Sequence, residues 1–301
     1  MSDNQRTFHF TLSDKGGAGK TFVTDKLVDT LRNRGKPTDS RAAHAEMARR
    51  KVAVFDLDAV NLSLASVHGI YTNGHYDLAA NMAATVESEF PSGCPVVDAR
   101  DEQKLGDLFN LLADPNFDFD DAVVDLPGGD QKEFDALTGS LRDLTQGLID
   151  LGFRIVLNYV IDHDPASSAG IAPTLCAWGA GPVLRVMKNF HDQKMISEPF
   201  RWYEGELGAG AKPVEIVRLV EGVELAVPHL HWGKKFREQQ TASHQPLSQL
   251  ALSFTERQQR LTFTRQFEAA LAASDRELAT RSGITPEQIE AVEAMLRKAA
   301  A

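Results

Sequence analysis

A glycine-rich run near the start of the chain contains the residue types that bind phosphate. It reads Ser13-Asp-Lys-Gly-Gly-Ala-Gly-Lys-Thr21 and stands between a predicted strand over 7–12 and a predicted helix over 22–34. Glycines let the backbone turn sharply, so its N–H groups come close to phosphate oxygens, and a helix N-terminus adds partial positive charge. Lys20 is expected to reach the β- and γ-phosphates of a nucleotide, and the Thr21 hydroxyl to bind Mg²⁺. The residues expected to contact the nucleotide here are Gly16, Gly17, Ala18, Gly19, Lys20, Thr21 and Phe22.

Carboxylates follow two further predicted strands. Asp56 and Asp58 stand at the end of one apolar run, and Asp125 stands at the end of another. Such runs are typical of central parallel strands with both faces covered. Because ligands of open α/β sheets gather at the carboxyl ends of the strands, these carboxylates are expected near the phosphate loop. Glycines after Asp125 permit a close approach of the backbone to a ligand.

The loop from Lys15 to Thr21 resembles the deviant Walker A motif of the ParA/MinD family, P-loop ATPases of the SIMIBI class, which has an extra lysine at its front. In that family the front lysine crosses an ATP-bound dimer interface and touches the partner's nucleotide. The resemblance implies that Lys15 acts in trans and Lys20 in cis. It also implies a homodimer that ATP creates and hydrolysis dissolves, with slow turnover that a protein partner stimulates.

Two further motifs resemble the same family. By that resemblance Asp56 and Asp125 hold waters bound to Mg²⁺, and Asp58 positions the attacking water. The Pro-Gly-Gly run over 127–129 resembles the family's switch, in which the Gly128 or Gly129 N–H senses the γ-phosphate. The family's usual Pro-Gln after the second aspartate is replaced by Ala-Val-Asn over 59–61, which leaves the partner of Asp58 open and implies slow hydrolysis.

The base-reading element is the weakest of these motifs. Asn189 ends a predicted strand, and its amide presents a donor and an acceptor together, so it is the candidate base contact, with a simple turn asparagine as the alternative. Pro228 follows a valine in a step that resembles the Ile-Pro pair flanking adenine in this family. ATP is therefore expected from the resemblance alone, and the residues themselves leave ATP against GTP open.

Alternating strand and helix patterns predict an α/β fold, a mostly parallel, doubly wound P-loop NTPase sheet flanked by helices. We expect an ATPase domain over 1–255 and a C-terminal helical extension over 256–301 docked on it. A polar, basic insertion is expected over 38–51, and the loops over 62–110 are expected to contact partners. In the extension, Thr285-Pro-Glu-Gln288 matches a capping box. Further predicted elements are helices over 103–112, 131–151 and 171–178, strands over 154–161, 184–190 and 223–230, a short strand over 96–98 and a mobile loop over 162–168.

The composition excludes several classes of protein. The net charge is −10, which disfavours DNA binding through overall charge, although a local basic patch stays possible. No apolar run is long enough for a transmembrane helix, and the polar start lacks a signal peptide's apolar core. Two distant cysteines, Cys94 and Cys176, form neither a disulfide framework nor a CxxC metal pair. A cytoplasmic protein is the simplest interpretation.

Three classes of function remain. The first is a ParA/MinD-type switch ATPase in plasmid or DNA partition, positioning or conjugative transfer. The second is a metabolic or assembly enzyme on the same fold, of the kinase or ligase kind, which a co-substrate requirement would reveal. The third is a nucleotide-binding module with little turnover. Five intact residues argue against it: Lys20, Thr21, Asp56, Asp58 and Asp125. The sequence names neither the cargo nor the partner, nor whether DNA or a membrane surface is bound.

Overall fold

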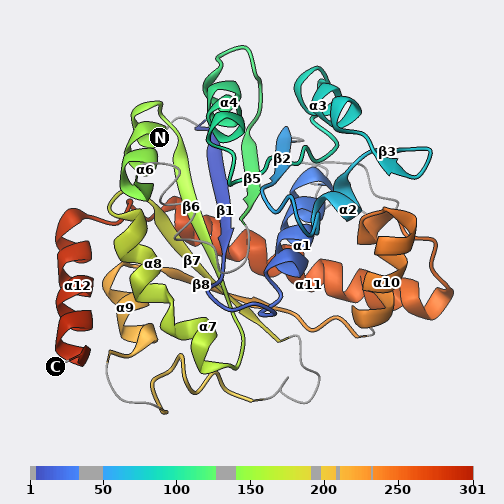
Figure 1. The fold of residues 1–301 in the computed structure, drawn as a ribbon. Coiled ribbons are helices and arrows are strands. Elements are labelled where there is room, and N and C mark those ends of the chain that lie inside the picture. Colours follow the sequence, from blue (N-terminus) through green and yellow to red (C-terminus); the bar gives the residue numbers. More distant parts are fainter. Residues whose placement is uncertain are drawn as a thin grey trace.

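Within the part of the chain that the structure describes, parallel strands form one central sheet. This computed structural model describes residues 5–33, 50–126, 140–190, 198–207, 211–231 and 233–300. The strand order is β2-β5-β1-β6-β7-β8, with every neighbouring pair parallel (Figure 1). Helices cover both faces, so the predicted doubly wound α/β fold is confirmed. The strands are β1 (Thr7–Leu12), β2 (Val52–Asp56), β5 (Asp121–Asp125), β6 (Arg154–Ile161), β7 (Val183–Asn189) and β8 (Val223–Val227).

Strand β1 lies in the middle of the sheet and carries the phosphate loop at its carboxyl end. It pairs with β5 on one side and β6 on the other. Phe8, Phe10 and Leu12 alternate toward one face, where they are buried in the larger hydrophobic core. His9 and Thr11 alternate toward the other face and are also buried. The same alternation thus gives β1 one apolar face and one polar, buried face.

The apolar face of β1 is covered by a layer of helices from the middle and the end of the chain. Trp178 packs against Phe10 with ring centroids 4.7 Å apart, and Phe153 packs against Phe8 at 4.8 Å. In Figure 1 these helices lie beside one another on one side of the sheet, with α12 outermost. They are α4 (Glu102–Ala113), α6 (Leu141–Asp150), α8 (Ile171–Trp178), α9 (Pro213–Leu219) and α12 (Pro286–Ala300).

The opposite face is covered by the helix that follows the phosphate loop together with two helices from the C-terminal part. Val28 on the first of these helices and Phe267 and Leu271 on the longest share one buried cluster with residues of the sheet. Phe22 is half buried and lies near Phe263, with ring centroids 6.0 Å apart. These helices are α1 (Lys20–Asn33), α10 (Gly233–Ser243) and α11 (Phe254–Ala279).

The C-terminal helices begin with capping boxes. The Thr285 N–H donates to Gln288 Oε1 at 2.8 Å, and the Gln288 N–H donates to Thr285 Oγ1 at 3.2 Å, which confirms the predicted box. Ile289 and Val292 are buried against α8 and α9. Helix α11 packs on β7 and β8 across the other face. The division of the chain at residue 255 stays a prediction.

Some elements differ from those predicted. The predicted mobile loop contains a short helix, α7 (Pro165–Ala169), which Asp164 caps through the Ala166 N–H at 2.9 Å. The predicted short strand over 96–98 is a single bridge between Val96 and Asp56. Helix α6 begins at Leu141, and the earlier part of the helix predicted over 131–151 lies outside the described residues. Elements that were not predicted are α2 (Ala65–His68), the hairpin β3 (Tyr71–Thr72) with β4 (His75–Tyr76), α3 (Leu78–Val86), α9, α10 and the 3₁₀ helix η2 (Leu247–Gln249).

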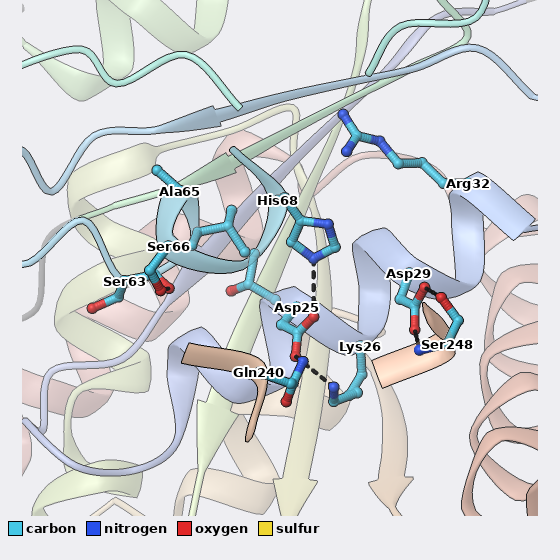
Figure 2. A network of polar contacts seen from close by, with 12 residues as sticks. Asp25, Lys26, Asp29, Arg32, Ser63, Ala65, Ser66, His68, Gln240 and Ser248 are labelled. Atoms are coloured by element: carbon cyan, nitrogen blue, oxygen red, sulfur yellow. Dashed lines mark hydrogen bonds and ion pairs between the residues drawn. The ribbon is translucent and has the colours of Figure 1, made fainter. Parts of the chain in front are cut away.

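A buried polar cluster joins α1, α2 and α10. The Asp25 carboxylate accepts hydrogen bonds from Lys26 Nζ, from His68 Nε2 at 2.9 Å and from Gln240 Nε2 at 3.0 Å. Figure 2 shows His68 and Gln240 meeting Asp25 from their two separate helices. Burial alone would raise the pKa of Asp25, but the Lys26 ammonium and the His68 ring outweigh it and hold that pKa well below its ordinary value. The cluster therefore links α1, which follows the phosphate loop, to α2, which follows β2.

Candidate nucleotide-binding site

The glycine-rich loop lies between β1 and α1, as predicted, but it spans residues 13–19 and not 13–21, because α1 begins at Lys20. Gly17 and Gly19 have φ of +90° and +83°, values that side chains other than glycine rarely adopt. A Cβ atom at Gly19 would lie 2.2 Å from Nδ2 of Asn189, so a side chain there would also collide with β7. Gly16 and Gly17 are exposed, with open space around them. The loop thus leaves its backbone open to a ligand on one side and packs closely on the other.

Lys20 lies against the end of β5. Its Nζ is 2.7 Å from Asp125 Oδ1, and it also donates to the Leu126 carbonyl oxygen. Thr24 Oγ1 donates to the same carboxylate oxygen at 3.0 Å, and Thr21 Oγ1 donates to Oδ2 at 3.4 Å. The structure therefore brings the loop lysine, the loop threonine and the aspartate of β5 together.

Asp56 lies beside Asp125, since the two residues are register partners at the ends of β2 and β5. Its carboxylate accepts hydrogen bonds from the backbone N–H groups of Asp58 at 3.0 Å, and of Leu64 and Ala65 at 2.9 Å each. Burial and the charge of Asp125 raise the pKa of Asp56 to about 7, despite these donors. Two neighbouring carboxylates of this kind are stabilised when a cation lies between or near them.

Oxygen ligands for a divalent cation are available at this place. The Thr21 hydroxyl and the carboxylates of Asp56 and Asp125 are hard donors of the kind that Mg²⁺ prefers, and Mg²⁺ sites need few protein ligands when phosphate oxygens supply the rest. No group of three or more His, Cys, Asp or Glu side chains suited to a metal occurs within the described ranges. The donors therefore fit a magnesium ion shared with a bound nucleotide.

Asp58 has a partner that the sequence left open. Its Oδ2 accepts a hydrogen bond from Asn61 Nδ2 at 2.8 Å, and its Oδ1 accepts one from the Asn61 N–H at 3.0 Å. Asp58 is half buried, whereas Asn61 is exposed. The Asn61 amide thus orients the Asp58 carboxylate at the edge of the site.

Lys15 is held by two carboxylates of its own chain. Its Nζ is 2.9 Å from Asp162 Oδ2 and 3.2 Å from Asp164 Oδ2, both in the turn that follows β6. Burial alone would lower the pKa of Lys15, but the two carboxylates outweigh it and raise the pKa above its ordinary value. The side chain stays 28% exposed, so the charged group lies within reach of a ligand outside the chain.

The residues predicted to contact the base lie beside the loop at the ends of β7 and β8. Asn189 is buried, and its Nδ2 donates to the Ala18 carbonyl oxygen at 2.9 Å, so the amide nitrogen supports the loop. Pro228 directly follows β8, next to the register pair of Asn189 and Val227. Phe22 lies on α1 near Phe263 of α11. The roles of these three residues toward a nucleotide stay predictions.

Two predicted features lie outside the described residues. They are the Pro-Gly-Gly run over 127–129 and most of the insertion predicted over 38–51. At the end of that insertion, Arg50 pairs with Asp121 and Lys51 pairs with Asp118.

Four residues of the site were not predicted from the sequence. Thr24 follows Lys20 by one helical turn, and this spacing was a usable signal for its contact with Asp125. Asn61 was noticed only as a departure from a motif. Asp162 and Asp164 carried no signal, because they reach Lys15 only through the pairing of β1 with β6.

No protein-family model matches the chain, and neither does any curated protein. Among solved structures, the chain is similar to the MinC:MinD cell division protein complex of Aquifex aeolicus, with 17% identity, 87% of this chain and 96% of that chain covered, and a TM-score of 0.47. It is also similar to a ParA family ATPase of Chlorobium tepidum TLS, with 12% identity and a TM-score of 0.49. That match covers 87% of this chain and 99% of the other. A third similar structure is that of a putative plasmid partition protein of Borrelia burgdorferi B31 bound to AMPPNP. The match has 10% identity and a TM-score of 0.37, and it covers 87% of this chain and 99% of the other. At such identities and scores no residue role is transferred, and function is inferred from the geometry of the site.

Proposed function

We propose that this protein is an ATP-binding and ATP-hydrolysing switch of the ParA/MinD type. The observation that carries the proposal is the meeting of Lys20, Thr21, Asp125 and Asp56 at the carboxyl ends of three neighbouring strands. Together with a loop of exposed glycine amides, this arrangement supplies a cation, a hydroxyl and two carboxylates around one point. Phosphoryl transfer requires these groups and needs no covalent intermediate on the protein.

In the proposed reaction the loop N–H groups and Lys20 bind the phosphates. Lys20 exchanges its bond to Asp125 for bonds to the β- and γ-phosphate oxygens, where negative charge increases during transfer. Asp58, oriented by Asn61, positions the attacking water. Thr21, Asp56 and Asp125 would hold Mg²⁺, which when bound neutralises charge on the phosphates.

Lys15 provides the proposed link between nucleotide and dimerisation. In the single chain it pairs with Asp162 and Asp164. We propose that it leaves them in the ATP-bound dimer and contacts the nucleotide of the second copy.

A protein partner that stimulates hydrolysis and a cytoplasmic location complete the proposal, and the two free cysteines support that location. None of the described helices combines the length and apolarity that crossing a membrane requires.

We expect Asn61→Ala to lower kcat about tenfold while leaving KM nearly unchanged, because it removes a charge-assisted hydrogen bond that orients Asp58. Steady-state ATP hydrolysis measures the effect. Asn116→Ala is the matched control, since the exposed Asn116 donates to Asp114 in the same way, in the loop between α4 and β5. Equal kcat values for the two variants would show that Asn61 has no role in hydrolysis.

The switch itself is tested by molar mass. We expect light scattering to give a monomer with ADP and a dimer with ATP. Asp58→Ala should prolong the dimer because hydrolysis slows, and Lys15→Ala should abolish it because the contact in trans is lost. Thermal unfolding of each variant checks that it is folded.

Other outcomes favour the remaining classes of function. If ATP binds but the molar mass is the same with ADP and with ATP, the proposed role of Lys15 in trans is wrong. An enzyme on the same fold then becomes the leading interpretation. Tight binding with no turnover would indicate a nucleotide-binding module.

A further inference from the structure

A polar cavity of about 180 Å³ lies at the amino ends of the strands, at the other end of the sheet from the phosphate loop. Thr7, Asp121 and Arg154 are the first residues of β1, β5 and β6, and all three line it. A six-residue strand such as β1 is about 20 Å long, so the cavity is well separated from the phosphate loop. Its charged or titratable lining residues are His9, Arg50, Asp121, Arg154, Arg185 and Asp275.

Both carboxylates of the cavity already have cationic or donor partners. Asp121 is buried and accepts from His9 Nε2 at 3.2 Å and from the Arg50 guanidinium at 2.9 Å. Asp275 pairs with Arg185, which is fully buried. The anionic groups of the lining are therefore neutralised by their own neighbours.

Hydrogen-bonding capacity remains on two lining residues. His9 is 5% exposed, and its Nδ1 is buried with no hydrogen-bond partner in the described part of the chain. Because His9 Nε2 donates to Asp121, Nδ1 of the neutral ring is an acceptor. Arg154 donates to the carbonyl oxygens of Leu278 and Arg281 but has no carboxylate at ion-pair distance among the residues described. A buried polar atom without a partner is costly, and such an atom in a native protein usually meets a water, an ion or a ligand.

Charge and size together indicate the kind of ligand. Three arginines face two carboxylates, so the lining has a net positive charge even with His9 neutral. The volume equals that of about six water molecules, enough for a tetrahedral oxyanion or a small dicarboxylate but too small for a nucleotide. Guanidinium groups bind such anions through paired N–H donors.

We propose that this cavity binds a small oxyanion, with Arg154 and His9 as its principal ligands. The oxyanion would accept hydrogen bonds from the Arg154 guanidinium, and a hydroxyl that the anion keeps, as in hydrogen phosphate, would donate to His9 Nδ1. The inference does not depend on the proposed ATPase activity, because the cavity shares no residue with the phosphate loop.

Inorganic phosphate is the first probe. Calorimetric titration is carried out on the full chain with saturating ADP, so that the phosphate loop is filled. We expect one phosphate per chain, and we expect Arg154→Gln to weaken its binding by about tenfold to a hundredfold. Arg142→Gln is the matched control, because the exposed Arg142 also donates to a carbonyl oxygen, that of Cys176, and it should leave the affinity unchanged.

A second measurement avoids relying on one substitution. Phosphate should shift the ring NMR signals of His9, identified by their loss in His9→Gln, and this shift should follow the calorimetric curve. The same titration with succinate decides whether a phosphate or a carboxylate is the better ligand. The proposal is overturned if neither anion binds at millimolar concentration, or if Arg154→Gln and Arg142→Gln bind phosphate equally. Repeating the titration in Lys20→Met keeps this outcome separate from failure of the ATPase proposal, since that substitution should leave the cavity unchanged.

Discussion

Lys20→Met is expected to lower the rate of ATP hydrolysis about 100- to 1,000-fold, because it removes a fixed positive charge from the phosphates as their charge increases. Nucleotide affinity should fall as well. The substitution also leaves Asp125, whose side chain is 1% exposed, without its ammonium partner. Loss of stability therefore has to be separated from loss of binding.

Introducing Lys20→Met into an Asp125→Asn variant separates the loss of stability from the loss of binding. In Asp125→Asn the buried carboxylate is absent, so adding Lys20→Met leaves no unpaired charge. Binding of a fluorescent ADP in EDTA then compares the two variants without any contribution from Mg²⁺. We expect Lys20→Met to weaken ADP binding at least about tenfold in the Asp125→Asn variant. Equal affinity would show that Lys20 serves only as the partner of Asp125, and the phosphate-loop assignment would be wrong.

Asp25→Asn is expected to reduce the free energy of unfolding by about 3 to 5 kcal/mol, measured by urea denaturation. Lys26 is 2% exposed, and the substitution leaves its ammonium buried beside a neutral amide. Asp29→Asn is the matched control, one turn further along α1, where the half-buried Asp29 meets Ser248. The control should lose less than about 1 kcal/mol.

Two further measurements test the electrostatic explanation. Asp25→Asn combined with Lys26→Met should recover much of the lost stability, because neither charge then remains. The pKa of Asp25 in the folded chain lies below its unfolded value, so its contribution is complete above about pH 4 and is lost as the pH falls further. The difference between wild type and Asp25→Asn should therefore shrink below about pH 4. A difference that persists in acid would attribute the loss to packing.

The parts that were predictable from sequence depend on short-range chemistry. The phosphate loop needs glycines at particular positions, and positive φ at Gly17 and Gly19 gives the physical reason. Asp56 and Asp125 end apolar strands, and parallel pairing then brings them together. The capping box at Thr285 is likewise a local signal that survives into the structure.

The parts that were not predictable depend on residues far apart in the chain. His68 and Gln240 meet Asp25 only because three helices converge there (Figure 2). His9 looked like the polar side of an ordinary alternating strand, and its burial follows from α1 and α11 covering that face. The same holds for Arg154, whose carbonyl partners lie at the end of α11.

The central place of β1 also governs how the chain can fold as it is synthesised. The strand is made long before its pairing partners, which are residues 121–125 on one side and 154–159 on the other. The helices that cover the two faces of the sheet include α11 and α12, which follow all six of its strands in the chain. Contacts this distant in sequence form slowly, and an apolar strand is prone to aggregate as long as its pairing partners have not been made. During translation the growing chain therefore carries an unfinished core until α11 and α12 have been made.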